Sequence, residues 1–511
     1  MKKSIWYLVL CLFSFNGLLG QTQDTVNYMV KVKDAQQHLL DVEMQLTLSP
    51  EAKETVVVSI PTWMPGYYQL MNYAEKVSGF QVKNEEGKLL PAEKKDPQSW
   101  QIQPKGNRKL IISYMVKADR NFVASPYLDE AHAYLVSTGV FLYPVGELQR
   151  PARISIDMDQ QGWKDVATGL ERVSPDNPFI VSAANYDVLY DSPILVGNLS
   201  KLPTFYVRQI PHDFYAFAMQ EGDGQALMDD LKKAVTAAVD LIGDIPYNHY
   251  TFIGIGQGRG GIEHLNSTTV SFDGPPQDSA GRVQVLNFLT HEYFHHYNVK
   301  RIRPIELGPF DYSKPNRTKQ LWISEGLTVY YEFILLNRAG IYSPRQVLDL
   351  LAAQITQYEA NEGKHYQTLA EASEQTWEDG PFGERSGKSI SYYVKGPIVG
   401  LLFDLAIRKA TEGKKSLDDV MRQLYYRYDK ELGRGFTEQE FKEVCKTVSG
   451  SDLTELFEYI YTTKELNYAK YLGYAGLSLI KEGDRYLLQK QANASKEANQ
   501  LFHQFLIGGK Q

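Results

Sequence analysis

The sequence predicts an α+β multidomain protein, in which an antiparallel β-domain is followed by a mixed domain and then by a helical domain. Three observations predict this order. As far as about residue 205, apolar and polar residues alternate in short runs, which is the period-two pattern of strands. From 206 to 342, strand-like runs and helical runs follow one another. From 343 to about 466, the apolar spacing is mostly helical.

Size and composition fit such a protein. The chain has 511 residues, of which 43% are hydrophobic and 23% charged, as is usual for a globular protein of about three domains. The net charge of −7 is spread along the chain, and the basic run KRIR at 300–303 is short. We therefore expect no nucleic-acid partner. The sequence does not indicate an oligomeric state.

Residues 1–20 have the form of a secretory signal peptide. Two lysines precede an apolar run that is shorter than a membrane span requires. After cleavage near Gly20, Cys445 is the one remaining cysteine, so no internal disulfide can form, and we expect this thiol to be buried. We expect an exported protein, periplasmic or extracellular, without stable membrane insertion once the signal is removed. An uncleaved anchor and lipid attachment at Cys11 are the alternatives.

The β-domain is expected over residues 21–205. Turn clusters separate its strand-like runs, which are VNYMVKV (26–32), DVEMQLTL (41–48), TVVVSI (55–60), KLIISYMV (109–116) and ARISIDM (152–158). The segment PTWMPGYY (61–68) concentrates proline, glycine and aromatic residues in one rigid loop. We expect this loop to form a structural corner, and its reaching into an active cleft is the alternative.

The mixed domain is expected over residues 206–342. TFYVRQI (204–210) and YTFIGIG (250–256) have the pattern of strands, and the segment 225–243 is an amphipathic helix that ends at Gly243. A glycine-rich turn and GGIEHLNSTTVSF (260–272) follow, and then comes a helix that carries an HExxH pattern.

The HExxH pattern consists of His291, Glu292 and His295. Residues four apart lie on one face of a helix, so both imidazoles can reach one metal ion, and Glu292 lies where it can polarise a water at the metal. Solvated surface histidines are the alternative, but the apolar residues before His291 indicate a buried helix, where such a cluster needs partners or a metal. A strand, a turn, a strand and a metal-binding helix are, in this order, the elements of a thermolysin-like catalytic domain.

A third protein ligand is needed to complete a catalytic zinc site. Glu325 is our candidate, because it begins a strongly apolar helix (320–336) in which a carboxylate is costly to bury. A charge favoured by the helix dipole is the alternative for Glu325. Glu332 lies seven residues later on the same helical face, where it is either a hydrogen-bond partner of a ligand histidine or a solvated charge.

The helical domain is expected over residues 343–466 and a short tail over 467–511. The helical runs are 347–359, 396–410, 417–428, 438–448 and 453–463. The tail contains one strand pair, GLSLIKEGDRYLLQK (476–490), and a terminal helix, and it is too short for an ordinary independent domain.

Five segments together resemble the glycyl aminopeptidase family of gluzincin metallopeptidases, peptidase family sixty-one. They are PTWMPGYY (61–68), GGIEHLNS (260–267), HEYFHHYNVKRIRP (291–304), LWISEGLTVYYE (321–332) and SYYVKGPIVGLL (391–402). The resemblance runs from about 25 to 465. It implies one Zn²⁺ per chain on His291, His295 and Glu325, with Glu292 as the general base. It also implies an aminopeptidase that removes small first residues, such as Gly or Ala, from peptides.

By the same resemblance, GGIEH corresponds to the exopeptidase loop of these enzymes, with Gly260, Gly261 and Glu263 binding the substrate. Glu263 would bind the free α-ammonium, since a fixed carboxylate near zinc registers the first peptide bond at the metal. The alternative is that Glu263 pairs within the fold. His264 and His296 are expected to be packed histidines rather than ligands.

Tyr393 matches the tyrosine that donates a hydrogen bond to the oxyanion in related aminopeptidases. Tyr392 is the alternative donor. In two places the chain departs from the family pattern: Tyr297 stands where members often have Trp, and no complete C-terminal PDZ domain is recognisable after about 470, so the tail is interpreted as a possible remnant. An endopeptidase on the same scaffold and a non-catalytic exported peptide-binding protein are the alternative functions.

Overall fold

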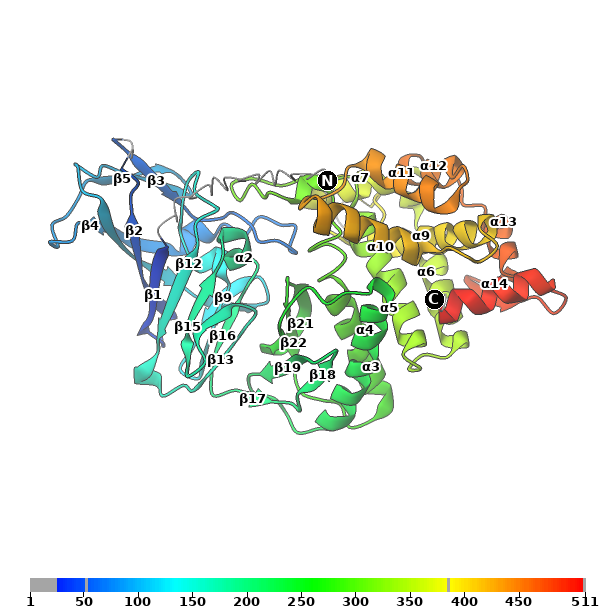
Figure 1. Ribbon diagram of the computed structural model, residues 1–511, viewed down its shortest axis with the longest axis horizontal. Coiled ribbons are helices and arrows are strands. Elements are labelled where there is room, and N and C mark those ends of the chain that lie inside the picture. Colours follow the sequence, from blue (N-terminus) through cyan, green and yellow to red (C-terminus); the bar gives the residue numbers. More distant parts are fainter. Residues whose placement is uncertain (1–24, 51–53, 384–386, 509–511) are drawn as a thin grey trace, which may run out of the picture.

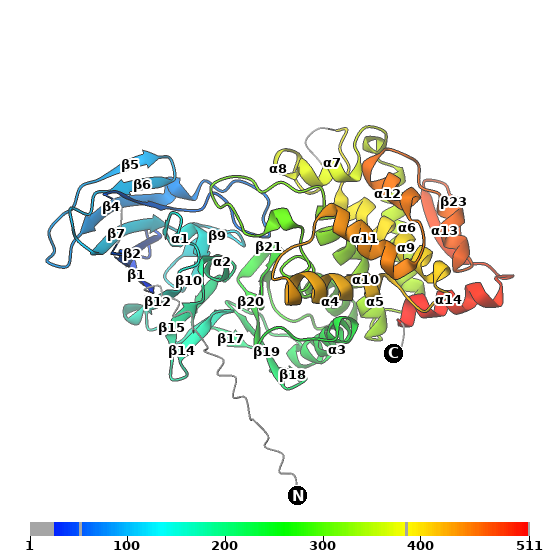
Figure 2. The same ribbon diagram turned by 45° about the horizontal axis from the view of Figure 1, so that its top comes forward.

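The computed structural model describes residues 25–50, 54–383 and 387–508, so the predicted signal peptide and Cys11 lie outside the described residues. A β-rich part and a helical part lie on opposite sides of a central mixed part in both views (Figures 1 and 2). This arrangement confirms the predicted α+β multidomain fold class, whereas the exact domain boundaries stay predictions. Among the described residues, no helix combines the length and the apolarity needed to cross a bilayer.

The largest sheet of the β-domain has the strand order β14-β15-β12-β1-β2-β7-β4. Side chains alternate between the core and solvent along β1 and β2, as the period-two pattern predicted. The pair β1–β12 is parallel, unlike the antiparallel arrangement that we expected throughout, because the long segment between these strands permits a crossover. The strands are β1 (Val26–Asp34), β2 (Leu39–Thr47), β4 (Val77–Lys83), β7 (Lys109–Lys117), β12 (Ala152–Asp157), β14 (Glu171–Ser174) and β15 (Asn177–Ala183).

Two smaller sheets complete the β-domain, with the orders β13-β16-β10-β9-β8 and β11-β3-β6-β5. Their strands are β3 (Val56–Ser59), β5 (Ala92–Asp96), β6 (Ser99–Ile102), β8 (Asp119–Phe122), β9 (Ser125–Leu128), β10 (His132–Leu135), β11 (Tyr143–Pro144), β13 (Asp165–Thr168) and β16 (Ile194–Gly197). The short helices α1 (Ser137–Val140) and α2 (Tyr186–Tyr190) lie between strands of this domain.

The central part contains a mixed sheet with the order β17-β19-β20-β22-β21. Its strands are β17 (Ser200–Lys201), β18 (Phe205–Val207), β19 (Ile210–Ala216), β20 (Tyr250–Gly254), β21 (Gly256–Glu263) and β22 (Ser267–Phe272). The prediction of one strand over 204–210 is wrong. Arg208 and Gln209 have φ values of 45° and 70°, so the chain reverses there and β18 pairs with β19 in a hairpin.

Long helices pack beside this sheet. Asp223 accepts a hydrogen bond at the start of α3 (Gly224–Ile242), and Gly243, with φ of 97°, ends the helix as predicted. The HExxH pattern begins in α4 (Ser279–Phe294), which packs between α3 and α5 (Leu327–Arg338). The leucines of α4 that face its neighbours are buried, so the HExxH helix lies in the core rather than on the surface.

The helical part packs around α9, which is buried along most of its length. Its helices are α6 (Pro344–Glu359), α7 (Leu369–Glu374), α8 (Thr376–Asp379), α9 (Tyr392–Ala410), α10 (Leu417–Leu424), α11 (Glu438–Ser449), α12 (Thr454–Tyr461), α13 (Tyr468–Tyr474) and α14 (Lys496–Ile507). Cys445 on α11 is a free, buried thiol, as predicted. The predicted strand pair of the tail is the hairpin β23 (Leu477–Glu482) and β24 (Arg485–Lys490), which packs on α6.

Candidate metal centre and adjoining cleft

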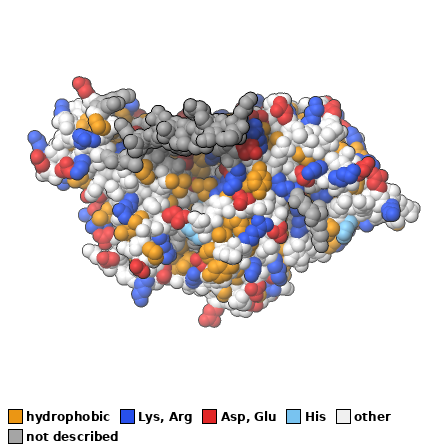
Figure 3. Space-filling view, viewed as in Figure 1, with side chains coloured by type: hydrophobic (Ala, Val, Ile, Leu, Met, Phe, Trp, Pro, Cys, Tyr) orange, Lys and Arg blue, Asp and Glu red, His pale blue; other side chains and the backbone are white. Residues whose placement is uncertain are grey.

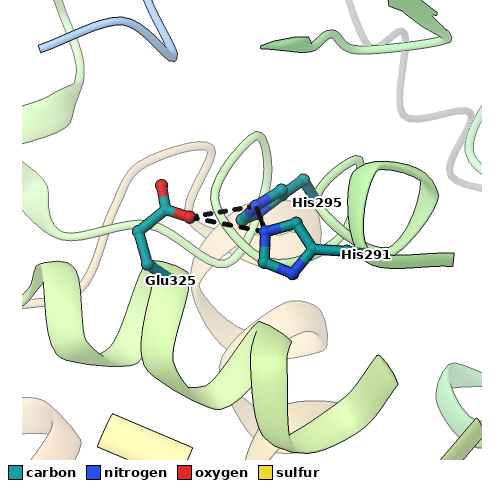
Figure 4. Close-up of side chains that lie close together, drawn as sticks. All are labelled: His291, His295 and Glu325. Atoms are coloured by element: carbon teal, nitrogen blue, oxygen red, sulfur yellow. Dashed lines mark hydrogen bonds and ion pairs between the residues drawn. The ribbon is translucent and has the colours of Figure 1, made fainter. Parts of the chain in front are cut away.

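The side chains of His291, His295 and Glu325 converge on one point (Figure 4). The two Nε2 atoms of the histidines lie 3.0 Å apart. The Oε2 atom of Glu325 lies 3.1 Å from Nε2 of His295 and 3.8 Å from Nε2 of His291. One candidate ligand atom from each residue therefore lies within 4.8 Å of the other two.

Local backbone geometry explains this convergence. α4 ends at Phe294, but His295 keeps helical dihedral angles, so the two imidazoles remain one turn apart on one face. Glu325 lies in a π-helical turn, Trp322–Gly326, which continues into α5. The helical stretch begins at Leu321, so Glu325 lies in its first turn, where the helix dipole also favours a carboxylate. π-helical turns within helices are frequent at functional sites.

The donor set fits a zinc ion. Oε2 of Glu325 is buried and accepts no well-formed hydrogen bond from the described residues. Two imidazole nitrogens and a carboxylate oxygen face one another in the interior. All three are hydrogen-bond acceptors, so they lack enough protons to form hydrogen bonds with one another. A tetrahedral divalent cation with one open position satisfies all three, and this set of ligands is one that catalytic zinc uses.

The outward nitrogens of the two histidines are held by other groups. Nδ1 of His291 lies 2.6 Å from Oε2 of Glu332, whose Oε1 accepts a hydrogen bond of 2.9 Å from Asn287. Nδ1 of His295 lies 2.7 Å from the carbonyl oxygen of Asn298. Each Nδ1 then donates, which leaves each Nε2 free to bind the metal. Of the two roles left open for Glu332, the structure thus shows the buried hydrogen-bond partner and not the solvated charge.

Glu292 is buried beside the two histidines and faces the edge strand β21. A Cβ atom on Gly261 would lie 2.7 Å from Oε1 of Glu292, so only glycine lets β21 approach this closely. Burial raises the pKa of Glu292 to about 7, although the neighbouring histidines act in the opposite direction. A carboxyl group with a pKa near neutrality can both take up and return a proton.

Glu263 lies on the same strand and is also buried. Its Oε1 accepts no hydrogen bond from the described residues, and the Nζ atom of Lys300 lies 3.6 Å from it. Gly66 covers this carboxylate: a Cβ there would lie 2.9 Å from Oε1 of Glu263. The loop 61–68 therefore reaches the site, and the preferred interpretation of a structural corner away from the cleft is wrong.

Burial lowers the pKa of Lys300, but the carboxylates of Asp191 and Glu263 outweigh this effect and hold it above its usual value. Lys300 is therefore an ammonium. The sequence did not predict that Lys300 and Asp191 lie beside Glu263. Lys300 is notable there only as part of a short basic run, and Asp191 stands in the distant β-domain, where no sequence signal pointed to it.

The two adjacent tyrosines have different environments. The hydroxyl of Tyr392 is buried and lies 3.0 Å from that of Thr376. The ring of Tyr393 lines the cleft, with its centroid 6.1 Å from that of His291. This geometry favours Tyr393 as the donor at the metal centre.

The remaining histidines near the site are packed, as predicted. His264 and His296 have no exposed surface. His264 lies 3.5 Å from Asp191, and His296 lies among the rings of Tyr247 and Tyr293. Neither belongs to the metal cluster found among the described residues.

A cleft of about 390 Å³ adjoins the metal centre and is lined from all three parts of the chain. The β-domain contributes Tyr67 and Phe122, the strand β21 contributes Gly260 and Gly261, and the helical part contributes segment 379–382 with Tyr393. Apolar rings dominate this lining. Basic and acidic side chains are interspersed over the face of the molecule in Figure 3 rather than gathered by sign.

Comparison with known families gives two matches. Residues 27–198 match the Peptidase M61 N-terminal domain, and residues 284–399 match the M61 glycyl aminopeptidase domain. Together they cover more than half of the chain. No curated protein sequence matches.

Solved structures share the fold. An aminopeptidase N family protein from Idiomarina loihiensis has 26% sequence identity and a TM-score of 0.83, over 90% of this chain and 79% of its own. An M1 zinc metallopeptidase from Deinococcus radiodurans has 12% identity and a TM-score of 0.54, over 87% and 95%. Aminopeptidase A from Legionella pneumophila, solved with aspartic acid, has 16% identity and a TM-score of 0.51, over 85% and 49%. At such identities the last two show the fold alone.

Proposed function

Because the chain belongs to the M61 glycyl aminopeptidase family and is a zinc metallopeptidase, we propose that it hydrolyses the N-terminal peptide bond of peptides. One observation carries this proposal. The buried carboxylate of Glu263 has an oxygen without a hydrogen-bond donor, next to the cleft at the metal centre. Such a group matches the free α-ammonium of a peptide.

His291, His295 and Glu325 would hold one Zn²⁺ per chain. When bound there, zinc polarises the scissile carbonyl group and lowers the pKa of water. The buried Glu332 keeps His291 in the required tautomer, and the carbonyl of Asn298 does the same for His295.

The other residues of the site act on the peptide and on protons. Glu263 binds the α-ammonium and thereby places the first peptide bond beside Glu292. Glu292 takes a proton from the attacking water and passes it to the leaving amine. The hydroxyl of Tyr393 donates a hydrogen bond to the carbonyl oxygen as negative charge develops on it.

We further propose a preference for small first residues such as Gly or Ala. The family description supports it, and so does the loop at Gly66, which closes over Glu263 and leaves little room around the amino terminus. The aromatic cleft beside Tyr393 would then bind the residue after the scissile bond. Digestion of a peptide library, with cut sites mapped by mass spectrometry, tests both preferences. The form of residues 1–20 supports export to the periplasm or beyond as the setting of this activity.

The experiment that tests the aminopeptidase activity compares free peptides with their N-acetylated forms. Acetylation removes the ammonium that Glu263 is proposed to bind, so cleavage at the first bond should be lost. Equal cleavage of both forms would indicate an endopeptidase on the same scaffold. Absence of cleavage of every peptide by the zinc-loaded protein would favour a peptide-binding protein.

A further inference from the structure

Lys300 lies between two carboxylates in the interior of the protein. Its Nζ atom is 2.7 Å from Oδ1 of Asp191 and 3.6 Å from Oε1 of Glu263. All three residues are buried. They come from separate parts of the chain: Asp191 follows α2 in the β-domain, Glu263 ends β21, and Lys300 follows the HExxH helix.

Asp191 is fixed independently of Lys300. Its Oδ2 accepts a hydrogen bond of 2.8 Å from the backbone N–H of Leu265, and its Oδ1 lies 3.5 Å from Nδ1 of His264. His264 and Leu265 directly follow Glu263 in the sequence. These contacts therefore fix the Asp191 carboxylate beside the end of β21, where Glu263 lies.

The Lys300 side chain ends in the same chemical group as the amino terminus of a peptide. If this ammonium paired directly with Glu263, it would take the place proposed for the substrate. In the structure Lys300 lies closer to Asp191. Its Nζ donates a hydrogen bond of 2.7 Å to Asp191 and forms only a longer ion pair of 3.6 Å with Glu263, whose Oε1 accepts no hydrogen bond from the described residues.

We propose that Asp191 is a positioning residue, which holds the ammonium of Lys300 away from Glu263 and so keeps Glu263 open for the amino terminus of the substrate. The inference rests on the proposed function, which gives Glu263 its role. It makes the β-domain a contributor to substrate recognition, since this domain supplies Asp191.

Charge balance supports this role. Asp191, Lys300 and Glu263 together carry one net negative charge, which a peptide ammonium neutralises. Without the Asp191 carboxylate, Lys300 and Glu263 would form a neutral pair, and the substrate would add an uncompensated positive charge to a buried site, which is strongly unfavourable.

The experiment compares the wild type with Asp191→Asn, Lys300→Met and the double variant, measuring KM and kcat on a free peptide and the zinc content of each protein. Asp191→Asn should raise KM by about 10- to 100-fold, the effect of one hydrogen bond to a charged group, while zinc content is kept. The double variant should have a lower KM than Asp191→Asn alone, because the competing ammonium is gone.

A purely structural role for Asp191 predicts the reverse order, with the double variant at least as impaired as the single one, and this result would overturn the inference. Asp418→Asn is the matched control. It breaks a buried ion pair of 3.0 Å with Arg338, outside the cleft, and should leave KM unchanged. Should Asp191→Asn fail to fold, Asp191→Glu, which pushes Lys300 toward Glu263, gives the same comparison with and without Lys300→Met.

N-acetylated peptide separates this inference from the function on which it rests. If the wild type cleaves acetylated and free peptides equally, Glu263 does not bind an amino terminus and the proposed function fails. If acetylation abolishes cleavage but Asp191→Asn leaves KM unchanged, the proposed function stands and the role of Asp191 is refuted.

Discussion

Nδ1 of His291 lies 2.6 Å from Oε2 of Glu332, which stands on the helix that follows Glu325. One helix thus presents a carboxylate to the metal and, two turns later, a second carboxylate to the back of a ligand histidine. Glu325 would bind the metal, and Glu332 orients His291, which would bind it as well.

Loss of Glu332 should therefore weaken metal binding without abolishing it. In Glu332→Ala, His291 loses the group that fixes its tautomer, and zinc affinity should fall by about 10- to 100-fold. Competition with a chelator measures this directly. Glu332→Gln, which keeps an acceptor oxygen, should lose less, and an unchanged zinc affinity in Glu332→Ala would show that this contact does not support the site.

Gly261 should be intolerant of even one added carbon. The Cβ of an alanine there would lie 2.7 Å from Oε1 of Glu292 and from the ring of Phe288, so Glu292 must shift. A displacement on this scale can lower kcat by about 10²-fold, and zinc content should not change. Gly473→Ala, which adds a Cβ with no atom within 4 Å, is the control and should keep full activity.

Tyr393→Phe should lower kcat by about 10²- to 10³-fold, or ~2.7–4 kcal/mol of barrier, because it removes a donor to the developing oxyanion. The matched variant Tyr392→Phe loses only the contact with Thr376 and should retain most of its activity. Steady-state kinetics on one peptide decide between the two tyrosines. A large loss in Tyr392→Phe with little in Tyr393→Phe would reverse the assignment.

A buried lysine predicts an unusual dependence of stability on pH. Lys395 has no exposed surface, its Nζ accepts or donates no hydrogen bond among the described residues, and it lies 5.4 Å from the centroid of the Tyr358 ring. Burial lowers the pKa of Lys395 from 10.5 to about 8. Between these values the unfolded chain binds a proton that the folded protein does not, so this group's contribution to stability rises with pH.

Below pH 8, the buried charge of Lys395 lowers the free energy of unfolding by its full amount, about 3 kcal/mol. Lys395→Met should thus be more stable than the wild type at pH 7, with the difference shrinking as the pH approaches 10. Urea unfolding at several pH values measures the effect. A constant difference between the two proteins would show that Lys395 has an ordinary pKa.

The features that could be predicted from the sequence are those that one short segment determines by itself. His291, Glu292 and His295 share one helical face because of their spacing, and Glu325 could be found because an apolar helix rarely buries a carboxylate without a reason. The strands β1, β2, β7 and β12 followed from alternation. By contrast, the positive φ angles of Arg208 and Gln209 left no sign in the sequence, since these residue types rarely form such turns.

What the sequence could not predict depends on contacts between distant segments. Lys300 and Asp191 are 109 residues apart, and nothing local indicates that they pair. The loop at Gly66 looked like a corner because its composition is that of any rigid turn, and only the packing of the β-domain against β21 brings it over Glu263. The walls of the cleft, including Phe122 and Phe382, are likewise a product of tertiary structure.

The central claim is that Glu292 acts as the base beside a zinc ion held by His291, His295 and Glu325. Its most direct test is metal analysis and peptide turnover measured side by side on the wild type and Glu292→Gln. We predict one zinc per chain in both proteins and a turnover at least about 10²-fold lower in the variant. Equal turnover at equal zinc content would contradict the account.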